Sequence, residues 1–234
     1  MSDPVLIACS HGTSSESGRA AIRDIVDGVR ALLSGIEVVQ AFVDVELPQI
    51  DEVVATVTAQ DATAIVVPLL LSAGYHTRVD IRRAVASSDR AAAAPPLGTH
   101  PLVAELVVQR LTEAGATTDD AVVLAAAGSS DPGAAVDVRT VIETVSGLWG
   151  APVAAGFAAS AEPLLPEALA TAQTTGRRTV AASYVLAPGY FADVIQSAGF
   201  DVVTEPLGPH PSLAVAVADR YRAAVAQFSH AASK

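Results

Sequence analysis

Short apolar runs alternate with amphipathic stretches from one end of the chain to the other. In the first hundred residues, strand-like apolar runs occupy 5–10, 37–45 and 64–71, and helix-like patterns occupy about 20–33, 48–59 and 77–87. A further helix is expected over 101–113, where Gly115 would end it. Short runs of Val, Leu and Ala are typical of parallel strands that helices cover on both faces. The βαβαβα order therefore predicts a parallel sheet with right-handed crossovers.

The same pattern begins again after a polar stretch at 115–120. Four motifs of the first half recur in the same order in the second half. LIACSHGT corresponds to VVLAAAGS, AF with a later Pro to GF with a later Pro, LSAGYH to LAPGYF, and PLGTHP to PLGPHP. Ordered recurrence of this kind indicates an internal duplication. We therefore predict an α/β protein with two tandem flavodoxin-like lobes, each a parallel sheet flanked by helices, over residues 1–116 and 117–234.

Three titratable side chains lie at predicted strand ends in the first lobe only. His11 follows the first strand, Asp44 ends the second and His76 follows the third. The corresponding positions of the second lobe hold Ala127, Ala159 and Phe191. Ligands of open parallel sheets bind beyond the carboxyl ends of the strands, so the three side chains would converge if the first strand lay between the other two. The first lobe is therefore expected to carry the active site, and the second lobe a degenerate copy.

Two imidazoles and a carboxylate suit a borderline divalent metal ion and leave coordination positions open for a substrate. This donor set predicts His11 and His76 as metal ligands and catalytic residues, with Asp44 as a general base. A single histidine at a strand end is often a capping or core residue. The joint loss of all three side chains from the duplicate favours the functional interpretation.

The residues around these positions are candidates for binding a substrate. The turn after the first strand offers hydroxyls and backbone N–H groups to an anion, and a glycine after the third strand allows close approach of a ligand. Arg78 could pair with a ligand carboxylate, or it could be ordinary solvated charge. The candidates for substrate binding are Ser10, Gly12, Thr13, Gly74, Tyr75 and Arg78.

Other polar residues are interpreted as structural. His100 and His210 both occur in the PLGxHP motif, where a shared role at a helix start is expected. Ser14, Ser15, Ser130 and Asp131 could simply be helix-capping residues. Cys9 is interpreted as a small core residue.

The composition and net charge of the chain exclude several classes of function. Hydrophobic residues make up 51% of the chain, and the single cysteine excludes a disulfide framework. A formal net charge of −11 argues against nucleic acid or an anionic membrane as partner. No apolar run reaches the roughly 20 residues that span a bilayer. No signal peptide is evident, so the cytoplasm is the expected location.

The combined motifs resemble those of the sirohydrochlorin chelatases of the CbiX/SirB family, which are class II chelatases. The resemblance covers nearly the whole chain and rests on the motifs HGT at 11–13, FVD at 42–44 with Pro48, PLLL at 68–71, GYH at 74–76 with DI at 80–81, and PLG-HP at 96–101. It implies a two-lobed chelatase-like fold. It also implies ATP-independent insertion of Fe²⁺ or Co²⁺ into sirohydrochlorin, in sirohaem or cobalamin biosynthesis, with no cofactor beyond that substrate metal.

The resemblance further implies that His11 and His76 hold the metal on one face of the macrocycle. Asp44 stands where the family usually has Glu, and Glu46 is the alternative carboxylate. The choice among Fe²⁺, Co²⁺ and Ni²⁺ stays open, since the Irving–Williams order favours Ni²⁺ at such a site.

Two other functions compete with metal insertion. A histidine phosphatase would have Arg immediately before its catalytic histidine, and this chain has Ser10 there. A non-catalytic carrier of metal or tetrapyrrole is the more serious alternative, because the same ligands serve binding and insertion. A monomer is expected, since a fused duplicate supplies internally the pair that a single-lobe relative gains by dimerising.

Overall fold

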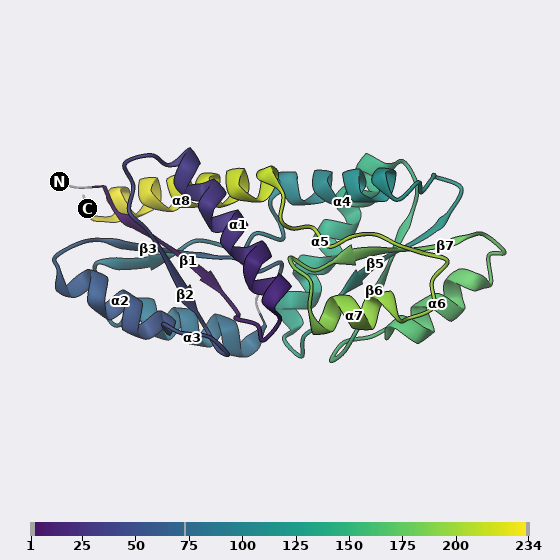
Figure 1. The fold of residues 1–234 in the computed structure, drawn as a ribbon, viewed down its shortest axis with the longest axis horizontal. Coiled ribbons are helices and arrows are strands. Elements are labelled where there is room, and N and C mark those ends of the chain that lie inside the picture. Colours follow the sequence, from purple (N-terminus) through teal and green to yellow (C-terminus); the bar gives the residue numbers. More distant parts are fainter. Residues whose placement is uncertain (1–2, 73, 233–234) are drawn as a thin grey trace. The chain divides into compact units, whose positions relative to one another are not determined.

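The computed structural model describes the backbone of residues 3–72 and 74–232, and their side chains except at 75–78 and 231–232. The chain forms two compact units, Met1–Leu97 with His210–Lys234, and Gly98–Pro209 (Figure 1). Each unit contains a four-stranded parallel sheet flanked by helices, so the predicted α/β class is confirmed. Within the described residues, no helix has the length and apolar character needed to cross a membrane.

The first unit has the strand order β2-β1-β3-β4. Its strands are β1 (Val5–Ser10), β2 (Val38–Phe42), β3 (Ala64–Pro68) and β4 (Ala91–Ala93). Its helices are α1 (Glu16–Leu32), α2 (Ile50–Ala59), α3 (Tyr75–Ala86) and α8 (Pro211–Ala232). Helices α1 and α8 pack together, and α2 packs with α3. A Cβ on Gly28 of α1 would lie 3.0 Å from the Ala214 Cβ of α8, so a small residue is needed at this crossing.

The second unit repeats this topology with the order β6-β5-β7-β8. Its strands are β5 (Ala121–Ala126), β6 (Val153–Phe157), β7 (Thr179–Tyr184) and β8 (Val202–Val203). Its helices are α4 (Pro101–Glu113), α5 (Pro132–Trp149), α6 (Leu165–Gln173) and α7 (Tyr190–Gln196). Helix α4 packs with α5, while α6 packs on β5, β6 and β7. The matching topology agrees with the duplication read from the sequence.

The compact units differ from the predicted lobes 1–116 and 117–234 in their last helices. Helix α4, from the first half of the sequence, packs against α5 and β7, and α8, from the second half, packs against α1 and β3. The chain changes units at both copies of PLGxHP. Arg110 of α4 donates hydrogen bonds to the carbonyls of Pro206 at 3.0 Å and Leu207 at 3.1 Å. The lobe boundaries are corrected accordingly, because each last helix buries its apolar face in the unit built by the other half.

Two predicted boundaries near the site are also corrected. Pro48 does not open a helix, because its carbonyl accepts the Phe42 N–H at 3.0 Å and α2 begins only at Ile50. The second strand therefore ends at Phe42, and residues 43–49 form a loop. Helix α1 begins earlier than expected, at Glu16, because Ser15 caps it through the Gly18 N–H.

The structural interpretations of the remaining polar residues are confirmed. His100 Nδ1 accepts the Leu102 N–H at 3.3 Å, and His210 Nδ1 accepts the Ser212 N–H at 3.2 Å, so both histidines cap helix starts. Asp131 caps α5 in the same way. Cys9 is buried in β1, where desolvation raises the pKa of its thiol to about 12 and leaves it an inert core residue.

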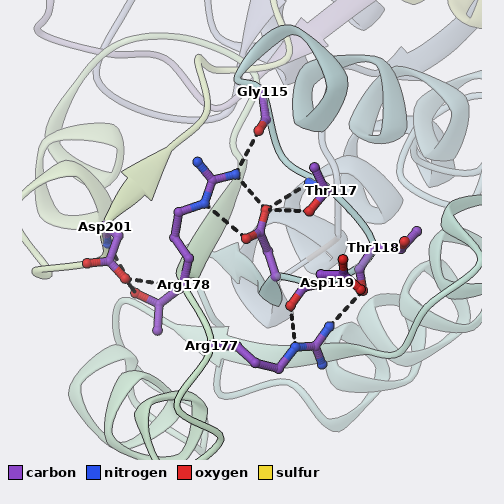
Figure 2. Close-up of polar contacts among 9 residues, drawn as sticks. Gly115, Thr117, Thr118, Asp119, Arg177, Arg178 and Asp201 are labelled. Carbon is purple, nitrogen blue, oxygen red and sulfur yellow. Dashed lines mark hydrogen bonds and ion pairs between the residues drawn. The ribbon is translucent and has the colours of Figure 1, made fainter.

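A charged network ties the polar stretch after α4 to the start of β7 (Figure 2). Arg178 donates to the Asp120 carboxylate at 2.6 and 2.9 Å and to the Gly115 carbonyl at 2.7 Å. Arg177 donates to the backbone carbonyls of Thr118 and Asp119. Since Asp120 directly precedes β5, the network lies at the amino ends of the strands, opposite to the edge where parallel sheets bind ligands. Its role is therefore structural.

This network predicts a specific acid sensitivity. The hydrogen bond from Arg178 lowers the pKa of Asp120 to about 2 from an ordinary value of 3.8. A carboxyl whose pKa is lower in the folded state stabilises the fold above its unfolded pKa, and this contribution is lost as the pH falls through the folded value. We expect the thermal unfolding midpoint to fall between about pH 4 and pH 2, and Asp120→Asn to lose this part of the pH dependence.

The neighbouring Asp119 provides the control, because its side chain is exposed and only its backbone carbonyl accepts from Arg177. Asp119→Asn should keep the wild-type profile in a calorimetric scan at each pH. An Asp120→Asn protein with the wild-type profile would show that the pair does not govern acid stability.

Candidate functional site

The carboxyl ends of β1, β2 and β3 meet at one edge of the first sheet, as the functional interpretation required. Strand β1 lies between the other two, with Ser10 opposite Phe42 and Cys9 opposite Pro68. The pairing continues beyond the strands, because the Asp44 N–H donates to the His11 carbonyl at 2.9 Å. The sheet therefore places His11 and Asp44 on adjacent segments of the same edge.

The turn at Gly12 fits tightly against the loop 43–49. Gly12 has a φ of +94°, and a Cβ at this position would lie 2.1 Å from the backbone oxygen of Asp44. The Asp44 oxygen also accepts the Glu46 N–H at 2.6 Å. A residue with a side chain at position 12 would push the two segments apart. Glycine is thus required where the histidine turn and the acidic loop touch.

The two candidate carboxylates have different surroundings. Glu46 is half-buried, and its Oε1 accepts the Thr13 N–H at 2.9 Å, so it locks the loop to the turn. Asp44 is exposed, and its Oδ1 accepts the neighbouring Val45 N–H at 2.7 Å. His11 is exposed as well. This arrangement leaves Asp44 accessible beside His11 and gives Glu46 a positioning role that the sequence alone did not reveal.

The other residues of the turn are either buried or hydrogen-bonded to neighbouring residues. Ser10 is only 4% exposed, and its hydroxyl has no hydrogen-bond partner among the side chains described. The Thr13 hydroxyl accepts the Ser15 N–H at 3.1 Å, and its carbonyl accepts from Arg19 at 3.4 Å. Substrate contacts of Ser10, Gly12 and Thr13 stay predictions, with Thr13 partly committed to local hydrogen bonds.

The third strand end carries the remaining candidates. Gly74 stands at the start of α3, whose first residues include Tyr75, His76 and Arg78. Their side chains lie outside the described residues, so their roles as metal ligand and substrate contacts stay predictions. Among the side chains that are described, no group of three or more His, Cys, Asp or Glu gathers as a metal site.

The second unit keeps the backbone of this edge without its chemistry. The Ala159 N–H donates to the Ala127 carbonyl at 3.0 Å, as Asp44 does to His11. Gly128 has a φ of +89°, and a Cβ there would lie 1.8 Å from the Ala159 oxygen. Both loops also contain a cis X–Pro bond, at Pro48 and Pro163. At the turn after the first strand and the loop after the second, the two units therefore share their backbone pairing and differ in their side chains.

Comparison with known proteins agrees with this picture. The family model described as CbiX matches residues 5–114 and again residues 121–224. The structure is similar to that of SirB from Bacillus subtilis with Fe³⁺, with a TM-score of 0.81, 22% sequence identity and 98% of each chain covered. It also resembles a sirohydrochlorin chelatase SirB from Bacillus subtilis subspecies spizizenii in complex with cobalt, with a TM-score of 0.74, 22% identity, and 95% of this chain and 94% of that one covered. A search of curated protein sequences gives no match.

A further similar structure is that of CbiX described as the terminal enzyme for biosynthesis of siroheme in denitrifying bacteria. Its TM-score is 0.64 at 18% identity, over 94% of this chain and 98% of that one. At these identities the solved structures establish a shared chelatase-like fold, and the double match of the family model spans nearly the whole sequence.

Proposed function

The chain belongs to the CbiX family, and from this premise we propose that it inserts a divalent metal ion, Fe²⁺ or Co²⁺, into sirohydrochlorin. The observation that carries the proposal is the contrast between the two units. The first unit places His11 and Asp44 side by side at its strand ends, whereas the second has alanines on the same backbone. Selective retention of a histidine and a carboxylate points to metal chemistry in the first unit.

In this mechanism the metal is a substrate that the protein holds only briefly. Neutral imidazoles of His11 and His76 would bind it while other coordination positions stay open to the pyrrole nitrogens. The pyrrole N–H protons of the macrocycle must leave as the metal enters. Asp44, exposed beside His11, is the proposed acceptor of those protons. The hydrogen bond from the Asp44 N–H to the His11 carbonyl would hold the two segments in register before the substrate binds.

Mutation should distinguish the roles of the Asp44 and Glu46 carboxylates. Asp44→Asn removes the proposed proton acceptor, and we expect kcat to fall about 100-fold, the low end of general-base contributions. Glu46→Gln keeps an oxygen that can accept the Thr13 N–H, so its kcat should stay within severalfold of wild type. Initial rates of metal insertion would measure both effects. A larger loss in Glu46→Gln would instead assign proton transfer to Glu46.

The proposed function is tested with the wild-type protein. Purified protein would be mixed anaerobically with sirohydrochlorin and with Fe²⁺, Co²⁺ or Ni²⁺ in separate runs, and the visible spectrum followed against a protein-free blank. Many turnovers per protein molecule are expected with Fe²⁺ or Co²⁺. A stoichiometric complex that never releases product would show that the protein is a carrier and not an enzyme. A rate equal to that of the blank, with no bound complex, would rule out both the chelatase and the carrier function.

A further inference from the structure

Two apolar side chains beside the candidate site are exposed to solvent. Val45 is 55% exposed and Leu47 is 75% exposed, and both belong to the loop 43–49 that carries Asp44. Leu47 is the most exposed large apolar side chain among those the structure describes. Isolated exposed apolar residues are common on proteins. Two in one short loop, both within three residues after the candidate catalytic carboxylate Asp44, need a specific explanation.

The backbone at Val45 makes the choice of residue more unusual. Val45 has a φ of +63°, in the left-handed region that β-branched residues rarely adopt. Such strain persists where the surroundings fix the backbone, and it concentrates at functional sites. The surroundings here are the hydrogen bonds of Asp44 to His11 and of Glu46 to Thr13. Glycine or asparagine would fit this conformation better, so the valine side chain is kept for something other than the fold.

The second unit shows that the loop geometry does not need apolar residues. Ser160 occupies the place of Val45 with a φ of +58°, and Glu162 occupies the place of Leu47 before the equivalent proline. Three backbone hydrogen bonds that hold the first loop, donated by the N–H groups of residues 42, 43 and 44, recur in the second loop at residues 157, 158 and 159. Polar side chains are thus compatible with the same turn. At these two positions, apolar side chains occur only in the unit that has the histidine and the carboxylate, whereas the exposed apolar residue of the second loop is Leu164, after its proline.

We propose that Val45 and Leu47 form the apolar contact that receives the macrocycle of the tetrapyrrole substrate next to Asp44. This inference rests on the proposed function. A tetrapyrrole has a planar conjugated macrocycle with largely apolar faces and carries its carboxylates at the periphery, so an apolar surface can cover part of a face while the carboxylates stay in water. Such a contact would also explain how a chain of net charge −11 binds an anionic substrate, since apolar burial does not depend on charge.

Two polar replacements of similar shape test the contact. Val45→Thr keeps the β-branch and therefore the backbone preference, and Leu47→Gln keeps the approximate length without adding charge. Leu32→Gln is the matched control, because Leu32 is also an exposed leucine of the first unit (47%) but lies at the end of α1, away from the carboxyl edge of the sheet. Binding of metal-free sirohydrochlorin would be followed by fluorescence titration, together with KM and kcat.

We expect Leu47→Gln to raise Kd and KM about tenfold, and Val45→Thr to raise them about threefold, with kcat within about twofold. Leu32→Gln should match wild type. If the wild type turns over and the double variant binds sirohydrochlorin as tightly as the wild type does, the proposed contact is wrong and the proposed function still stands. A wild type that binds without turnover, with Kd still sensitive to both substitutions, would retain the contact and overturn metal insertion.

Sedimentation of the same proteins addresses self-association. If wild type formed a dimer that the Leu47→Gln variant lost, with Kd for the tetrapyrrole unchanged, the loop would be an interface between copies of this chain and the proposal would be wrong. Equal sedimentation of wild type and variants, with weakened tetrapyrrole binding, is the expected result.

Discussion

Replacing His11 or His76 with alanine is expected to lower kcat for metal insertion by about 100-fold or more, because each change removes one of the two proposed nitrogen ligands of the substrate metal. His11 is exposed at the end of β1, so its loss should leave the fold intact. The loss should appear in kcat more than in KM for the tetrapyrrole, since the imidazoles bind the metal and not the ring. Anaerobic initial rates would measure kcat, and titration with Co²⁺ would measure metal binding.

His100 provides the control for these histidine variants. Its Nδ1 accepts the Leu102 N–H at the start of α4, so His100→Ala removes a helix cap. It should lower the free energy of unfolding by about 1 kcal/mol and leave kcat unchanged. If His11→Ala and His76→Ala retained wild-type turnover, the first unit would not hold the metal through these residues.

Gly12→Ala is expected to damage both stability and activity. The added Cβ would lie 2.1 Å from the Asp44 backbone oxygen, and alanine is strained at a φ of +94°. Because neither segment can move without breaking the pairing of His11 with Asp44, we expect a loss of about 2–4 kcal/mol in the free energy of unfolding. The molecules that still fold should insert metal at least about tenfold more slowly, because His11 and Asp44 are displaced.

Gly128→Ala is the matched change in the second unit. Its Cβ would lie 1.8 Å from the Ala159 backbone oxygen at a φ of +89°, so a similar loss of stability is expected in denaturant unfolding. Turnover per folded molecule should stay close to wild type, since no titratable side chain of the proposed site stands there. Equal activity losses in the two variants would mean that the second unit also takes part in catalysis.

Much of the local structure could be predicted from the sequence. The first strand and the helix over 101–113 have the boundaries expected for them, because an apolar run and a Pro-initiated amphipathic pattern are properties of consecutive residues. The duplication is visible because corresponding turns repeat their glycines and prolines. The helix caps at His100 and His210 follow from the same local pattern.

The arrangement of the loop 43–49 could not be predicted in this way. Pro48 looks like a helix start, yet its carbonyl pairs with Phe42, and Glu46 turns inward to the Thr13 N–H. These contacts join residues on different segments, so no window of consecutive positions contains them. For the same reason, the exposure of Val45 and Leu47 is visible only in the folded chain.

The sequence by itself determined the α/β class, the parallel sheets and the duplication, and it located His11 directly after the first strand. In the structure Asp44 lies two residues beyond β2 and His76 lies in the first turn of α3. Only the tertiary structure decided which sheet each last helix covers. Helices α4 and α8 both start at the last residue of a PLGxHP motif, so this local pattern does not specify which sheet each helix covers. The choice depends on packing with distant residues, such as the hydrogen bonds from Arg110 to Pro206 and Leu207. Local pattern specifies an element, whereas its partner is set by which distant surfaces fit together.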